Sequence, residues 1–285
     1  MKKTVKKATA AAAGTSAGAA GALTANRLVR RLAELAASGR KAFVAFILAG
    51  EPTLEATAAI VRALEAAGVT AVELGVPFSD PIADGPVIQA AGNRALAAGV
   101  TLRSIFELVA RLRRETAIPI LLMGYWNVFL KPGRDALLEG AAAAGVDGFI
   151  IPDLPLEADR AFYAAARERG LATVLLATEL TRDERLREIA AASTGFVYYV
   201  PKLGITGLDL EVTGAIRERI RAIKAMTSAP VSVGIGVKTR RDVELLTETA
   251  DGVIVGTRIV DFVDQNRTAS DLAGRVAEMV RGLVP

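Results

Sequence analysis

Two carboxylates on one short stretch of the chain, Glu73 and Asp84, have the surroundings expected of acid–base groups. Glu73 lies in an apolar run, Val72–Val76, in which valine and leucine alternate with other residues as in a strand. The loop that follows, Pro77–Pro86, contains three prolines, a glycine and two aspartates and is therefore rigid and acidic. Burial raises the pKa of a carboxyl group, which suits proton transfer near neutral pH. A strand-end glutamate that reaches solvent is the alternative, but the acidic loop favours a functional role.

Glycine-rich turns that follow the last two strand-like runs indicate a phosphate site. They read Gly234-Ile235-Gly236-Val237-Lys238-Thr239 and Gly256-Thr257-Arg258. Glycine lets backbone amides approach an anion closely, and a helix N-terminus attracts negative charge. A glycine that merely ends a strand tightly would explain either turn alone, whereas the two together favour a phosphorylated ligand. A third segment, Gly204-Ile205-Thr206-Gly207, has glycines suited to a loop hinge, and Gly207 is placed to cap the phosphate.

Three aromatic residues are expected on the same face as the carboxylates. Phe46, Tyr125 and Trp126 lie at or near the ends of strand-like runs. Apolar filling explains each of them singly, but beside a phosphate site they suggest a substrate with a flat apolar part and a phosphate group. The segment Asn127–Leu130 continues this surface outward, either as a partner contact or as packing.

Eight short apolar runs must position these groups. They are rich in valine, isoleucine and leucine without strict alternation, which is typical of parallel strands buried on both faces. The runs are Ala42–Ala49, Val72–Val76, Ile118–Tyr125, Gly148–Asp153, Ala172–Ala177, Phe196–Val200, Val231–Ile235 and Gly252–Val255.

Helical patterns separate these runs, beginning with an amphipathic helix that places Leu28, Leu32 and Leu35 on one face. Eight strand–helix units predict an α/β fold of the (β/α)8 TIM-barrel type. An open doubly wound sheet is the alternative, but no GxGxxG turn follows the first run. The two longest connections, Pro77–Leu102 and Pro201–Gly214, are expected to meet over one site at the carboxyl ends of the strands.

The composition excludes several kinds of chemistry. The 285 residues include no cysteine and no histidine, which rules out thiol and Ser-His nucleophiles and the usual zinc ligands. Carboxylates, lysine or tyrosine must therefore transfer protons, and no metal site is expected. The body of the chain has no uncharged apolar run of about 18 residues, so no membrane span is expected.

The basic residues that give the net charge of +4 lie in an N-terminal segment. Residues 1–24 hold four lysines and no acidic residue, while the rest of the chain is neutral and poor in aromatics, so nucleic-acid binding is not expected. This segment is of low complexity and is expected to be disordered, with organelle targeting as the alternative. We therefore divide the chain into an extension, residues 1–24, and a catalytic domain, residues 25–285, and expect a cytoplasmic protein.

The stretch Glu73–Pro86 resembles the signature of the tryptophan synthase alpha chain family. The similarity covers the chain from about Asn26 to the C-terminus. It continues in order, at similar spacing, through Gly50-Glu51-Pro52, Met123-Gly124-Tyr125-Trp126-Asn127, Gly204-Ile205-Thr206-Gly207, Gly234-Ile235-Gly236 and Gly256-Thr257.

The resemblance implies retro-aldol cleavage of indole-3-glycerol phosphate to indole and glyceraldehyde 3-phosphate, a step of tryptophan biosynthesis. Glu73 would then be the general acid–base, and Asp84 would accept the indole N–H and stabilise positive charge there. Phe46 and Tyr125 would line the indole pocket, and Thr206 would close onto Asp84. The phosphate-binding residues implied are Gly207, Gly234, Gly236, Gly256 and Thr257.

The resemblance also implies a partner. Family members pass indole to a beta chain that uses pyridoxal phosphate, so this chain would hold no cofactor and would assemble into an α2β2 heterotetramer. Asp80 and Asn127 are the residues expected at that interface.

Three positions depart from the family's common pattern, and two other functions stay open. Pro201 and Thr257 replace serine, and Ile235 replaces phenylalanine, which bears on loop closure and substrate affinity more than on the reaction. One alternative is a non-catalytic subunit that activates a beta chain, which the intact carboxylates disfavour. The other is a different phosphate-binding barrel, such as a phosphosugar isomerase, which leaves the loop Pro77–Pro86 unexplained.

Overall fold

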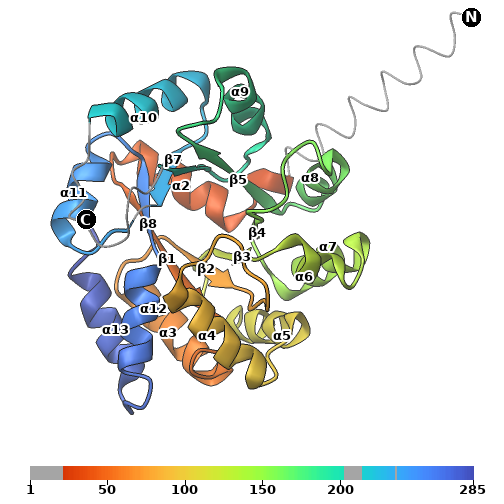
Figure 1. Ribbon diagram of the computed structural model, residues 1–285, viewed down its shortest axis with the longest axis vertical. Coiled ribbons are helices and arrows are strands. Elements are labelled where there is room, and N and C mark those ends of the chain that lie inside the picture. The colour runs from red at the N-terminus through yellow and green to blue at the C-terminus, as the bar shows by residue number, and fades with distance from the viewer. Residues whose placement is uncertain (1–21, 202–213, 235) are drawn as a thin grey trace, which may run out of the picture.

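Eight parallel strands close into a barrel in the computed structural model, which confirms the predicted TIM-barrel fold (Figure 1). The structure describes residues 22–201, 214–234 and 236–285. Each strand pairs with the next, and the last pairs with the first. The strands are β1 (Ala42–Leu48), β2 (Ala71–Gly75), β3 (Ile120–Met123), β4 (Gly148–Ile150), β5 (Ala172–Thr178), β6 (Val197–Val200), β7 (Val231–Gly234) and β8 (Gly252–Val255).

Helices surround the barrel on its outer side (Figure 1). The described helices are α2 (Arg27–Ala37), α3 (Leu54–Ala66), α4 (Pro86–Ala97), α5 (Leu102–Leu112), α6 (Trp126–Leu130), α7 (Arg134–Ala144), α8 (Arg160–Glu168), α9 (Asp183–Ala192), α10 (Gly214–Met226), α11 (Arg240–Thr247), α12 (Thr257–Gln265) and α13 (Leu272–Arg281).

Two of these helices, α4 and α6, are not among the elements expected from the sequence. The connection Pro77–Leu102 was expected to be a long loop, yet its second half is α4. Its composition explains the difference, because Pro86 follows Gly85 and stands at the first helical position, where proline is favoured rather than disruptive. The loop over the site is thus shorter and more firmly anchored than predicted.

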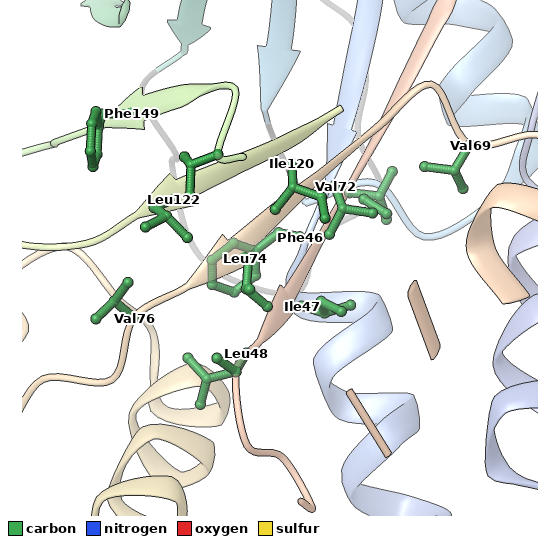
Figure 2. Packing of buried hydrophobic residues seen from close by; sticks show 14 of the residues in the cluster. Phe46, Ile47, Leu48, Val69, Val72, Leu74, Val76, Ile120, Leu122 and Phe149 are labelled. Atoms are coloured by element: carbon green, nitrogen blue, oxygen red, sulfur yellow. The ribbon is translucent and has the colours of Figure 1, made fainter. Parts of the chain in front are cut away.

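The strands separate two apolar layers. Residues that point outward from β1, β2 and β3, among them Ile47, Leu74 and Leu122, belong to the large cluster between barrel and helices (Figure 2). Residues that alternate with them, such as Val44, Ala71 and Leu121, belong to a smaller cluster with Leu28, Leu32 and Leu35 of α2. Helix α2 therefore supplies apolar side chains to the second layer, as the leucine pattern predicted.

Asn26 fixes α2 across the amino-terminal ends of the strands. Its side-chain oxygen accepts hydrogen bonds from the amides of Leu28 and Val29 and so caps the helix. Its side-chain nitrogen donates to the carbonyls of Asp147, at 2.7 Å, and Gly170, at 2.8 Å, which lie just before β4 and β5. One buried amide thus ties the first helix to two strands.

Asp147 anchors the same end of the barrel through its carboxylate. Only 1% of this side chain is exposed, and its two oxygens pair with Arg27 at 2.9 Å and with Arg113 at 2.7 Å. One of them also accepts the amide of Ile120 at 2.8 Å. Burial lowers the pKa of Arg113 to about 10, and the neighbouring Asp147 charge opposes that shift. The amino-terminal end thus carries structural charge, which leaves the opposite end for chemistry.

Replacing Asp147 with alanine is expected to lower the free energy of unfolding by about 3–5 kcal/mol, because Arg113 would stay buried without its partner. Urea denaturation measures this change. Glu34→Ala is the matched control, because it removes an exposed partner of Arg31 and should cost no more than about 1 kcal/mol. Equal effects of the two substitutions would contradict this role.

Candidate active site

Glu73 is the buried carboxyl group that the sequence predicted, although it lies deeper than expected. It is the third residue of β2, opposite Phe46 of β1 and Leu121 of β3, and its side chain is fully buried. Neither carboxyl oxygen is hydrogen-bonded by any described residue. Burial alone raises the pKa of Glu73 from its ordinary value of 4.5 to about 8. The group is therefore mostly protonated at neutral pH but still able to exchange its proton.

Asp84 lies in the loop after β2 and is held by Tyr125. The Tyr125 hydroxyl accepts the amide of Ala83 at 3.0 Å and hydrogen-bonds the Asp84 carboxylate. Burial raises the pKa of Asp84, and the hydrogen bond from Tyr125 partly opposes this shift. Burial, together with the negative charge of Asp84, raises the pKa of Tyr125 to about 12, so its hydroxyl stays a donor. The ring of Phe78 lies 5.4 Å from that of Tyr125 and packs the loop against β3.

Tyr198 of β6 is the residue that lies near both carboxylates, and sequence reasoning missed it. Burial raises its pKa well above the ordinary value, and the charges of Glu73 and Asp84 add to the shift. Its ring lies against Gly234 of β7, where a first side-chain carbon would come within 2.7 Å of the ring carbon Cζ. The sequence held one usable signal, because a Tyr-Tyr pair at a strand end beside the predicted site offers one inward hydroxyl.

Phe46 is the β1 neighbour of Glu73, and two glycines make room for it. Its side chain is only 6% exposed. A first side-chain carbon at Gly75 would lie 2.7 Å from Cζ of Phe46, and one at Gly256 would lie 3.3 Å from its Cβ. The ring therefore occupies space that any larger residue at Gly75 would fill. Two glycines predicted to bind phosphate thus also leave room for aromatic side chains, Gly234 for Tyr198 and Gly256 for Phe46.

The N-terminus of α12 is available to an anion, whereas that of α11 is not. Helix α12 begins at Thr257, directly after Gly256, which has no side chain to cap the first-turn amides. At α11, by contrast, the side chain of Asp242 accepts the amides of Lys238 and Thr239 at 2.9 and 2.8 Å. Only part of the turn after β7 is then suited to phosphate, and Gly236 belongs to that exposed part.

The remaining predicted residues divide into three groups. Trp126 is not in the site, because its ring packs against Phe162 of α8 at 4.9 Å while the chain turns into α6. Asp80 and Asn127 are exposed on the loop after β2 and on α6. Thr206, Gly207 and Ile235 lie outside the described residues.

The described part of the chain offers neither a metal site nor a membrane-spanning helix. It contains no group of three or more His, Cys, Asp and Glu side chains that could hold a metal ion. No helix in that part is long and apolar enough to cross a membrane.

Comparisons with known proteins point to one family. The family model of the tryptophan synthase alpha chain matches residues 32–283. The chain belongs to this family. A tryptophan synthase alpha chain from Geobacter sulfurreducens is 43% identical over 258 residues, which are 90% of this chain and 97% of the relative.

Solved structures agree with this family. The crystal structure of the tryptophan synthase alpha chain from Legionella pneumophila has a TM-score of 0.81 and 31% identity, and it covers 91% of this chain and 97% of its own. A chain of the tryptophan synthase a2b2 complex from Pyrococcus furiosus has a TM-score of 0.79 and 38% identity, covering 85% and 97%. The family catalyses the alpha reaction, a carbon–carbon lyase reaction, and this chain is such an enzyme.

The raised pKa of Glu73 has a measurable consequence for stability. A carboxyl group whose pKa is higher in the folded than in the unfolded chain favours folding most below pH 4.5 and loses that contribution as the pH rises to about 8. Glu73→Gln removes the titration, so the variant should be more stable than the wild type by about 2–5 kcal/mol at pH 8–9. This gain should shrink towards zero below pH 4.5. Urea denaturation over this pH range tests it, and a difference independent of pH would contradict the burial of a titrating group.

Proposed function

We propose that Glu73 and Asp84 carry out the cleavage of indole-3-glycerol phosphate to indole and glyceraldehyde 3-phosphate, within a catalytic domain of residues 25–285 that works in the cytoplasm. The observation that supports this most is the fully buried Glu73 carboxyl, whose oxygens have no hydrogen-bond partner among the described residues. A group held in this way costs stability, and its raised pKa suits a proton donor and acceptor.

The reaction needs two proton movements, and Glu73 can supply both. In its neutral form Glu73 gives a proton to indole C3, and positive charge develops on the ring nitrogen. The resulting carboxylate then takes the proton of the glycerol hydroxyl while the carbon–carbon bond breaks and its electrons return to the indole ring. One proton is donated and one is recovered, so the enzyme ends the cycle in its starting state.

Asp84 stabilises the charge that develops between these two movements. Its carboxylate accepts the indole N–H, and the positive charge on that nitrogen strengthens the interaction in the transition state. Tyr125 holds Asp84 through its hydroxyl and, with Phe46, lines the indole pocket. Tyr198 lies near both carboxylates and keeps its own proton, so it is suited to orient Glu73 or the substrate hydroxyl.

The phosphate group of the substrate is proposed to bind at the turns after β7 and β8. Gly236, Gly256 and Thr257 supply backbone amides there, and α12 adds the positive end of its dipole. Gly207 and Gly234 complete the predicted set. Gly256 after β8 lies against Phe46, which is the strand neighbour of Glu73, and β7 pairs with β8, so both turns are at the same end of the barrel as Glu73.

Substituting the two carboxylates separately tests their roles. Glu73→Gln is expected to lower indole release by about 10²–10⁴-fold, because the amide cannot transfer the proton. Asp84→Asn is also expected to lower turnover, since a neutral amide stabilises positive charge less well. Both variants should still bind the substrate, because the phosphate-binding turns and the aromatic walls of the indole pocket are unchanged. Turnover of Glu73→Gln above about a tenth of the wild-type rate would refute the acid–base role.

A beta chain that uses pyridoxal phosphate is the proposed partner, in an α2β2 heterotetramer in which this chain holds no cofactor. The exposed surface formed by the loop after β2 and by α6 supports this proposal. Ile82 and Leu130 are two of the three large apolar side chains exposed in the described residues. The hydrogen bond between Ala83 and Tyr125 joins the two segments that carry them. Asp80 and Asn127 lie on the same segments.

Asp80→Ala is expected to weaken the coupling to a beta chain by about fivefold or more, while turnover without the partner changes little. The measurement is the rate of indole formation with and without added beta chain. Asp135→Ala, which removes another exposed aspartate, on α7, is the matched control and should leave the stimulation intact. If a cognate beta chain does not stimulate the wild type, the chain acts as a free-standing lyase instead.

A further inference from the structure

Arg94 joins three elements at the active end of the barrel. It lies on α4, and its Nε is 3.1 Å from both carboxyl oxygens of Glu51, in the turn after β1. Its Nη2 is 2.8 Å from the Oδ1 atom of Asp264 on α12. One guanidinium group on α4 therefore connects this helix with the turn after β1 and with α12.

The two acidic partners depend on Arg94 to different degrees. The side chain of Glu51 is 2% exposed, and among the described residues no other side chain hydrogen-bonds or ion-pairs with its carboxylate. Asp264 is 40% exposed and also lies 3.9 Å from Arg267. Loss of Arg94 would leave a buried charge at Glu51, whereas Asp264 would remain solvated. The Arg94–Glu51 contact is thus the tight half of the cluster, and the Arg94–Asp264 contact is the half that reaches α12.

The helices that Arg94 joins begin at the two ends of the proposed substrate site. Helix α4 starts at Pro86, two residues after Asp84, and α12 starts at Thr257, directly after Gly256. The turn after β1 packs against the same region, because a first side-chain carbon at Gly50 would lie 3.5 Å from Ala95 of α4. The separation between the indole end and the phosphate end therefore depends on how α4 and α12 are held together.

We propose that Arg94 is a positioning residue for the reaction, which holds the Asp84 loop and the phosphate-binding turn at the separation that one substrate molecule requires. This inference rests on the function proposed above. Arg94 is not proposed to contact the substrate itself. It acts through its ion pairs with Glu51 and Asp264, which fix α4 relative to the turn after β1 and to α12.

The expected effect is on turnover more than on affinity. Without Arg94 the N-terminus of α12 still binds phosphate, and the aromatic walls still accept the indole ring. The reacting atoms are then held less accurately relative to Glu73 and Asp84, and displacements of about 1 Å can cost about 100-fold in rate. A contact that served stability alone would lower the melting temperature and leave kcat unchanged well below that temperature.

Steady-state cleavage of indole-3-glycerol phosphate by the full chain, well below the melting temperature of every variant, tests the proposal. Arg94→Met is expected to lower kcat by about 10–100-fold while KM changes by less than about threefold. Affinity for glycerol phosphate, a non-reacting probe of the phosphate site, should stay within the same factor. Arg94→Lys should recover much of the stability but only part of kcat, because an ammonium group lacks the planar fork that reaches both carboxylates.

Two further variants keep the test decisive. Asp264→Asn removes the charge that attracts Arg94 to α12 at an exposed position and leaves the pair of Arg94 with Glu51 intact, so it should fold even if Arg94→Met does not, and it should still lower kcat by severalfold. Arg62→Met is the matched control, because it breaks an ion pair with Glu115 between elements away from the site and should leave kcat unchanged. Unchanged kcat in Arg94→Lys and Asp264→Asn, or a rise in KM alone, would overturn the inference. A wild-type chain that does not cleave the substrate would instead refute the proposed function.

Discussion

The Glu73 carboxyl group lies inside the barrel without a hydrogen bond from any described residue. Its raised pKa and the proton transfer proposed for it both depend on this burial. A pKa of about 8 means that burying Glu73 lowers the free energy of unfolding by several kcal/mol at a pH where this side chain is ionised in the unfolded chain. Polar contacts at the opposite end of the barrel offset part of this cost in stability. At that end, near the amino termini of the strands, the buried side chains of Asn26 and Asp147 are hydrogen-bonded or ion-paired. The Glu73 carboxyl, by contrast, has no such partner among the described residues.

Small residues at strand ends provide the space in which this chemistry is possible. Gly75 and Gly256 flank the ring of Phe46, and Gly234 lies against that of Tyr198. Glu73 lies beside Phe46 in the sheet and is fully buried, and this burial is the cause of its raised pKa. The packing that buries Glu73 is therefore also what raises its pKa into the range proposed for acid–base chemistry.

Much of the fold and the burial of Glu73 could be predicted from the sequence, because buried parallel strands and proline-rich acidic loops have strong local signatures. The position of α4 could not, since proline and glycine suggested a loop where proline in fact starts a helix. Tyr198 and Arg94 were missed for another reason. The charge of Glu73 acts on Tyr198, and Arg94 pairs with Glu51 and Asp264, so the roles proposed for both residues depend on groups far apart in the chain. The predicted roles of Thr206 and Gly207 remain predictions, because both lie outside the described residues.

The most direct test of the central claim is the titration of Glu73 itself. In protein labelled with ¹³C at the glutamate carboxyl carbon, the Glu73 signal can be assigned by its absence from Glu73→Gln and followed by NMR as the pH is raised. We expect a midpoint near pH 8, with the carboxyl group protonated at neutral pH. A midpoint below about pH 5, the range of a solvated glutamate, would contradict it.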